Sequence, residues 1–117
     1  MKYLLMIYGN EATWDALSRE DDVMGRHRAL LDELSVSGEL IGTEGLTTAG
    51  ARTVRVSAGE AIVTDGPFTE AKEMLAGYYL VDCASVDRAT QIAARIPEAQ
   101  FSPVEIRRIM DDPGEWL

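Results

Sequence analysis

The segment that most constrains the fold is the apolar strand predicted at residues 2–8, KYLLMIY. Side chains alternate between the two faces of a β-strand. Both alternating sets in this segment are apolar: Tyr3, Leu5 and Ile7 in one, Leu4, Met6 and Tyr8 in the other. Because a large uncovered apolar face is unfavourable in water, the sequence predicts a strand that is covered on both faces.

Two segments have apolar residues at the three- and four-residue spacing of an amphipathic helix. The first helix is predicted at 19–37, after an acidic connection, with Ser18 as its N-cap and Gly38 as its C-terminal stop. The second helix is predicted to begin after Ser85, which caps it, and to stop before Pro97.

The remaining apolar segments predict strands. They are a short strand at about 40–46, a hairpin at 52–63 with its turn at 57–60, a strand at 77–83 and a last strand at 103–110. Without the hairpin, the order of elements is the βαββαβ arrangement of a ferredoxin-like sandwich. The predicted fold class is therefore α+β, ferredoxin-like, with an inserted hairpin.

The chain has no internal repeats or linkers, so residues 1–117 are predicted to form one domain. A ferredoxin-like sheet carries helices on one face only, yet the first strand is apolar on both faces. A second copy of the same sheet is the simplest cover, and two-fold symmetric dimers are common. We therefore expect a homodimer with the two sheets face to face.

Charge and hydropathy narrow the range of partners. The chain has 11 Lys and Arg against 20 Asp and Glu, a net charge of −9, whereas nucleic-acid binders need a positive surplus. The first apolar run ends at Gly9, too early for a membrane span or a typical signal peptide. Cys83 is the single cysteine, in an apolar setting that predicts a packed thiol. We expect a cytoplasmic protein with no nucleic-acid or membrane partner.

The common metal and cofactor motifs are missing from the sequence. One His and one Cys do not build a usual zinc site, and HExxH, CxxC and EF-hand spacings do not occur. GxSxG, P-loop and GxGxxG patterns do not occur either. The sequence therefore predicts no metal and no cofactor.

His27 and Asp65 are the candidates for acid–base catalysis. His27 is the only histidine and lies on the apolar stripe of its helix. An imidazole in a cleft can take or give a proton near neutral pH; the alternative is a core histidine bonded to a backbone carbonyl. Asp65 directly precedes Gly66 and Pro67, where a carboxylate either forms an Asx-type turn or orients the histidine.

Three further residues are candidates for substrate contacts. Tyr78 and Tyr79 point to opposite sides of their strand, so one faces the helices and the other faces the dimer side or a pocket. Arg55 is a candidate for binding a carboxylate, unless it only offsets acidic neighbours. Glu73 either lines a pocket or belongs to a solvated face. The other clustered cations are Arg52, Arg107 and Arg108.

The segment VTDGPFTEAKEMLAGYYLVD resembles the YCII-related proteins, and their DGPF branch in particular. MKYLLMIYG, His27 and GTEGLT before it, and VEIRRI after it, extend the resemblance over nearly the whole chain. Residues 65–73, DGPFTEAKE, fit the branch pattern DGPF-x-E-x-K-E at every specified position, whereas Arg108 replaces the proline that is usual at the end of the last strand.

The resemblance implies a dimeric α/β-barrel with a ferredoxin-like fold. It also implies that His27 and Asp65 match positions suspected of forming a His–Asp active-site pair. Members of the branch are associated with extracytoplasmic-function sigma factors, so the resemblance also implies a regulatory partner.

Two hypotheses follow for the function. In the first, the chain is a small cofactor-free enzyme in which His27 is the general acid or base, Asp65 orients it, and the substrate is a small organic molecule. In the second, it is a non-catalytic dimeric module that binds a ligand or a protein, with a sigma factor as the partner that the resemblance suggests.

Overall fold

The structure is a computed structural model that describes residues 1–68 and 73–116. The strands are β1 (Lys2–Gly9), β2 (Leu40–Gly45), β3 (Arg52–Ser57), β4 (Glu60–Asp65), β5 (Met74–Asp82) and β6 (Val104–Arg108). The helices are α1 (Glu11–Ser18), α2 (Val23–Val36) and α3 (Val86–Ala94), with short 3₁₀ helices η1 (Pro97–Gln100) and η2 (Pro113–Trp116). The predicted α+β class is confirmed.

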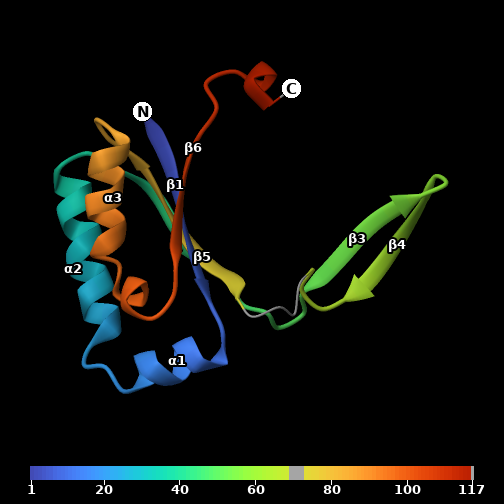
Figure 1. The fold of residues 1–117 in the computed structure, drawn as a ribbon, viewed down its shortest axis with the longest axis horizontal. Coiled ribbons are helices and arrows are strands. Elements are labelled where there is room, and N and C mark those ends of the chain that lie inside the picture. Colours follow the sequence, from blue (N-terminus) through green and yellow to red (C-terminus); the bar gives the residue numbers. More distant parts are fainter. Residues whose placement is uncertain (69–72, 117) are drawn as a thin grey trace.

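The main sheet has four antiparallel strands in the order β2-β5-β1-β6, so β1 lies between β5 and β6. Helices α2 and α3 lie side by side against one face of this sheet (Figure 1). This strand order and helix placement are compatible with a ferredoxin-like sandwich.

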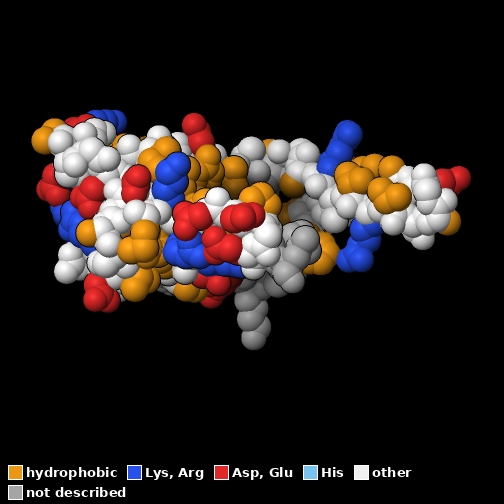
Figure 2. Space-filling model, turned by 90° about the horizontal axis from the view of Figure 1, so that it is seen from above, with side chains coloured by type: hydrophobic (Ala, Val, Ile, Leu, Met, Phe, Trp, Pro, Cys, Tyr) orange, Lys and Arg blue, Asp and Glu red, His pale blue; other side chains and the backbone are white. Residues whose placement is uncertain are grey.

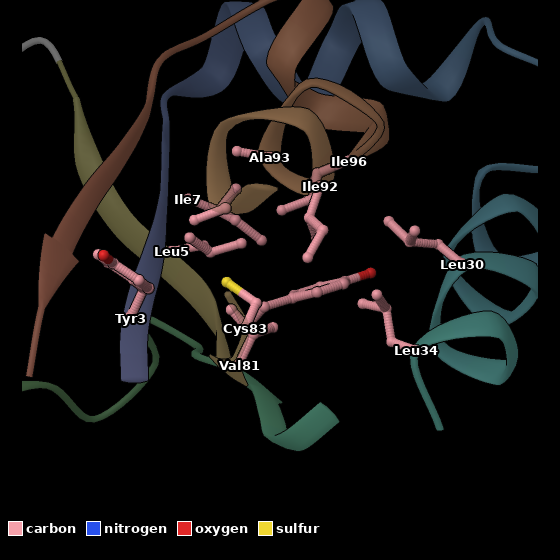
Figure 3. Close-up of a cluster of buried hydrophobic side chains, with 12 residues drawn as sticks. Tyr3, Leu5, Ile7, Leu30, Leu34, Val81, Cys83, Ile92, Ala93 and Ile96 are labelled. Atoms are coloured by element: carbon pink, nitrogen blue, oxygen red, sulfur yellow. The ribbon is translucent and has the colours of Figure 1, made fainter. Parts of the chain in front are cut away.

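The hydrophobic core lies between that face of the sheet and the helices (Figure 3). Its buried members are Tyr3, Leu5, Ile7, Leu30, Leu34, Tyr79, Val81, Cys83, Ala89, Ile92, Ala93 and Ile96. Cys83 is a buried free thiol, as predicted. The alternating burial along β1 and β5 shows that one side chain set of each strand faces this core.

The segment after β1 differs from the prediction of an acidic connection, because it forms α1. The Asn10 side chain accepts a hydrogen bond from the Thr13 N–H (3.0 Å), and the Thr13 hydroxyl accepts one from the Asn10 N–H (3.1 Å). This reciprocal capping box starts a helix directly after the strand. Ser18 is therefore the last residue of α1, and its predicted role as an N-cap is wrong.

Helix α2 begins at Val23 rather than at residue 19, and Asp22 is its N-cap. The Asp22 carboxylate accepts a hydrogen bond from the Gly25 N–H at 3.2 Å. A Cβ atom on Gly25 would lie 2.1 Å from Asp22 Oδ2, so only glycine leaves room for this cap. At the other end Gly38, with φ of 79°, stops the helix as predicted.

The predicted N-cap of α3 is confirmed, because the Ser85 side chain accepts the Arg88 N–H at 3.1 Å. α3 ends at Ala94, and Pro97 then starts η1. None of the helices in the described ranges is long and apolar enough to cross a membrane.

Strands β3 and β4 pair with each other in a separate antiparallel sheet, between β2 and β5 in the chain. This hairpin projects from the sheet on the side away from α2 and α3 (Figure 1). Its apolar side chains gather on its surface (Figure 2); Val54, Val56, Ile62 and Val63 are exposed.

Candidate active site

The ring of His27 is held between a phenol and a carboxylate. Its Nδ1 atom lies 2.6 Å from the Tyr79 hydroxyl, and its Nε2 atom lies 2.6 Å and 3.1 Å from the two Glu98 carboxylate oxygens. A carboxylate only accepts hydrogen bonds, so the Nε2–H group donates to Glu98. In the neutral ring, Nδ1 then accepts the Tyr79 hydroxyl proton, which fixes both the tautomer and the ring plane.

Three separate elements bring these side chains together. His27 lies near the start of α2 and Tyr79 lies on β5, on the face that the helices cover. Glu98 lies in η1, whose turn is held by hydrogen bonds from the Phe101 and Ser102 N–H groups to the Glu98 carbonyl (2.9 Å and 3.0 Å). The fold, rather than local sequence, therefore creates the cluster.

Burial controls the electrostatics of this cluster. The side chains of His27 and Glu98 are each 14% exposed, so their contact is shielded from water. Burial raises the pKa of the Tyr79 hydroxyl well above its usual range, and the charge of Glu98 raises it further. Tyr79 therefore remains a phenol, which can donate to the neutral ring of His27.

A cavity of about 330 Å³ lies beside the cluster, within the size range of small-molecule sites. Its apolar wall includes Ile7, Met24, Leu31 and Ala76, and its polar groups include His27, Tyr79, Glu98 and Thr43. A small organic molecule in this cavity would meet the His27–Glu98 pair, which can accept and return a proton.

Asp65 lies elsewhere in the chain, at the end of β4. Its side chain is 96% exposed and lies 3.9 Å from the Arg52 guanidinium, its partner across the hairpin. Within one chain the structure thus places Asp65 beside Arg52, and His27 beside Glu98.

The DGPF turn has a backbone role. Gly66 has a φ of 100°, a conformation that favours glycine. Its N–H donates to the Ala51 carbonyl at 2.7 Å, and its carbonyl accepts the Thr53 hydroxyl at 3.1 Å. These bonds close the base of the hairpin. Residues 69–72 of the motif lie outside the described residues.

The structure does not bring the predicted substrate-binding residues to the His27 cavity. Tyr78 points to the open face of the sheet, opposite to Tyr79. The Arg55 guanidinium lies over the Phe68 ring, 5.4 Å from its centroid, and Glu73 is exposed just before β5. Tyr79 and Glu98, which were not predicted as site residues, line the cavity instead.

The described residues, 1–68 and 73–116, also bear on metal binding. In those two ranges, no set of three or more His, Cys, Asp or Glu side chains is placed to hold a metal ion.

Comparison with known proteins assigns the family. The model of the YCII-related domain matches residues 1–113. A protein of Rhizobium meliloti (strain 1021), described as uncharacterized, is 40% identical over 121 aligned positions, covering 98% of this chain and 98% of that protein. Because both matches span nearly the whole chain, it belongs to the YCII-related domain family.

Proposed function

We propose that the protein is a small cofactor-free enzyme that transfers a proton on a small organic molecule, with His27 and Glu98 as its general acid–base pair. The observation that carries this proposal is the shielded 2.6 Å contact between His27 Nε2 and Glu98 beside a cavity of ligand size. In this pair Glu98 takes the role for which the sequence offered Asp65.

The two ring nitrogens of His27 already have hydrogen-bond partners, so the atom that meets the substrate is a Glu98 oxygen. A carboxylate has about four lone-pair directions, and the bond from His27 uses only part of this capacity. Glu98 takes a proton from a substrate C–H group next to a carbonyl, and the electron pair stays on the substrate as an enolate. His27 stabilises the change of charge through the shared hydrogen bond. The proton on Glu98 exchanges with water, and a proton from Glu98 then returns to the enolate, so no co-reactant is needed.

We also propose that the chain forms a homodimer and belongs to the DGPF branch. Leu4, Met6, Tyr78 and Leu80 form a half-buried apolar group on the sheet face opposite to the core, with Leu4 paired to Leu80 and Met6 to Tyr78. A second copy on this face would bury that group. The hairpin projects on the same side of the sheet (Figure 1), so Asp65 takes part in catalysis only if a second copy brings a hairpin to the cavity.

Deuterium exchange tests the proposed chemistry without a known substrate. Small ketones and aldehydes are incubated with the protein in deuterium oxide, and NMR follows incorporation of deuterium next to the carbonyl. We expect exchange with the native protein, and a loss of about 100-fold or more in Glu98→Gln and His27→Gln. Glu33→Gln is the matched control, because Glu33 is an exposed carboxylate that pairs with Arg95 outside the cluster.

Exchange that continues unchanged in His27→Gln and Glu98→Gln would show that the pair is not the catalyst. A native protein that exchanges none of the compounds, but whose His27 ring signals respond to them, would instead support a non-catalytic binding module.

A further inference from the structure

We propose that the cavity adjoining the His27 cavity is a second subsite, which binds a neutral aromatic ring of the same ligand against Trp14. This inference rests on the proposed function, because it assigns the distal part of the substrate. The second cavity has a volume of about 370 Å³ and is lined by Trp14, Leu46, Thr47, Thr48, Met74 and Leu75. Both cavities are also lined by Ala76 and Glu98, so one elongated molecule can occupy both and pass the Glu98 carboxylate.

Trp14 is a rigid wall of this cavity. A Cβ atom on Gly9 would lie 2.5 Å from Trp14 Cη2, so the indole ring rests directly on the Gly9 backbone. The helix that carries Trp14 is fixed by the Asn10–Thr13 capping box, and the Thr13 hydroxyl also accepts a hydrogen bond from the Ser102 hydroxyl at 3.1 Å. An aromatic plane held in this way binds a ring with little loss of side-chain entropy.

Exposed apolar surface at this cavity points to a ligand. Trp14 is 38% exposed, Leu46 49% and Leu75 41%, although all three are large apolar side chains. They line the same cavity, and covering clustered apolar surface removes it from water. A ring on Trp14 would cover part of each.

The charged and polar side chains that line the two cavities indicate which charge a ligand can carry. No Lys or Arg is among the described residues that line either cavity, whereas the Glu98 carboxylate lines both. Among the described residues, an anionic ligand would therefore meet a negative group and no cation. The Thr47 hydroxyl accepts the Ala49 N–H at 3.1 Å and can still donate its own proton. These features favour a neutral ring that carries a hydrogen-bond acceptor.

Three probes test the subsite: butanone, which has the carbonyl only; benzylacetone, which adds a neutral phenyl ring; and hydrocinnamate, which has the ring and a negative charge. Binding is followed by the indole N–H signal of Trp14 in proton–nitrogen NMR. The chain has two tryptophans, so Trp116→Phe assigns the signal. We expect benzylacetone to bind at least about tenfold more tightly than butanone, because it buries a ring. It should also bind more tightly than hydrocinnamate, because the negative charge of hydrocinnamate meets the Glu98 carboxylate.

Two variants test whether the preference for benzylacetone arises at the Trp14 cavity. Binding to these variants is followed by the His27 ring signals. Trp14→Leu and Leu46→Ser should reduce the preference for benzylacetone over butanone to within about threefold, a loss of most of the ring's burial energy. Val36→Ser is the matched control, because Val36 is exposed on α2, outside both cavities. Because Trp14→Leu removes a packed ring, Leu46→Ser at an exposed side chain provides a test that does not disturb packing.

The outcomes separate the subsite from the catalytic proposal. Equal affinity of the native protein for butanone and benzylacetone overturns the subsite, whether or not deuterium exchange occurs. A preference for benzylacetone that depends on Trp14, without deuterium exchange, leaves the subsite intact and overturns the proposed chemistry. A Trp14 signal that changes with protein concentration but not with the probes shows that a second copy covers the cavity, and also overturns the subsite.

Discussion

The Tyr79 hydroxyl lies 2.6 Å from Nδ1 of His27, and it donates its proton to this atom when the ring is neutral. Tyr79 is almost fully buried, at 2% exposure, and burial keeps its pKa raised, so the phenol is the form that persists in the folded chain. This contact holds the histidine with its Nε2–H group directed at Glu98.

Removal of this hydroxyl should therefore disturb the site without removing the ring from the core. We expect Tyr79→Phe to lower the free energy of unfolding by about 1 kcal/mol, the typical net value of one hydrogen bond. Deuterium exchange should slow by about tenfold, because the His27 ring loses its orientation. Urea unfolding and NMR exchange measure the two effects. Tyr78→Phe, on the opposite face of β5, is the control and should change neither.

The raised pKa of Tyr79 also predicts a loss of stability in alkali. In the unfolded chain the phenol ionises near its ordinary pKa of 10.0, whereas the folded chain keeps it neutral. The unfolded state is therefore favoured as pH rises above about 10. Urea unfolding should show that the free energy of unfolding decreases between pH 9 and pH 11, and that this decrease is smaller in Tyr79→Phe than in the native protein. An equal decrease in both proteins would show that Tyr79 is not the cause of the lost stability.

The Arg88–Glu39 contact predicts that the fold loses stability in acid. The Arg88 guanidinium binds both Glu39 oxygens, at 2.9 Å and 2.8 Å, and holds the pKa of Glu39 at about 2, with help from the Ser37 hydroxyl. Because this pKa is lowered from 4.5, the contact stabilises the fold above pH 4.5, and the effect is lost as pH falls towards about 2.

Glu39→Gln should accordingly cost about 1–2 kcal/mol at neutral pH, as for a partly screened charge-assisted hydrogen bond. Urea unfolding measures the difference in the free energy of unfolding between the variant and the native protein. This difference should become smaller as pH falls from about 4.5 to 2. Glu33→Gln, which breaks a more exposed pair with Arg95, is the control and should cost less. A difference that is constant with pH would exclude this explanation.

A charge placed on the open face of the sheet should convert the proposed dimer into a monomer. Leu80 lies on that face, half-buried, next to Leu4. In the proposed dimer Leu80→Lys would bury a charge without a partner, so we expect a monomer, while the native chain sediments as a dimer. Val36→Lys, at a residue that is 91% exposed on α2, should remain dimeric. A native monomer, or a dimeric Leu80→Lys variant, would disprove the proposed interface.

Most of the main sheet was predictable because its strands have strong local patterns. The apolar runs of β1 and β5, the N-cap at Ser85 and the stop at Gly38 all act through nearby residues. Helix α1 was missed because its capping box uses Thr13 in place of the usual Glu or Gln. Asp22 was missed as a cap because its positive φ of 48° is an uncommon conformation for a residue other than glycine.

The site was less predictable than the fold. The inward direction of His27 followed from helical spacing, but its carboxylate partner is 71 residues away in the chain. Glu98 follows a proline in a short 3₁₀ helix, where an acidic residue has an ordinary local explanation. Strand alternation placed Tyr78 and Tyr79 on opposite faces, but only the packing of α2 shows that Tyr79 reaches the histidine.

The position of β1 in the sheet has a consequence for how the chain folds. β1 is synthesised before the other strands of its sheet, yet its partners are β5 and β6, with Met6 paired to Tyr78 and Glu105. The central pairing is thus between residues far apart in sequence, and such high contact order slows folding, because a long loop must close before the contacts form. Until residue 108 has been synthesised, the apolar β1 segment lacks one of its neighbours, and aggregation competes with folding during this interval.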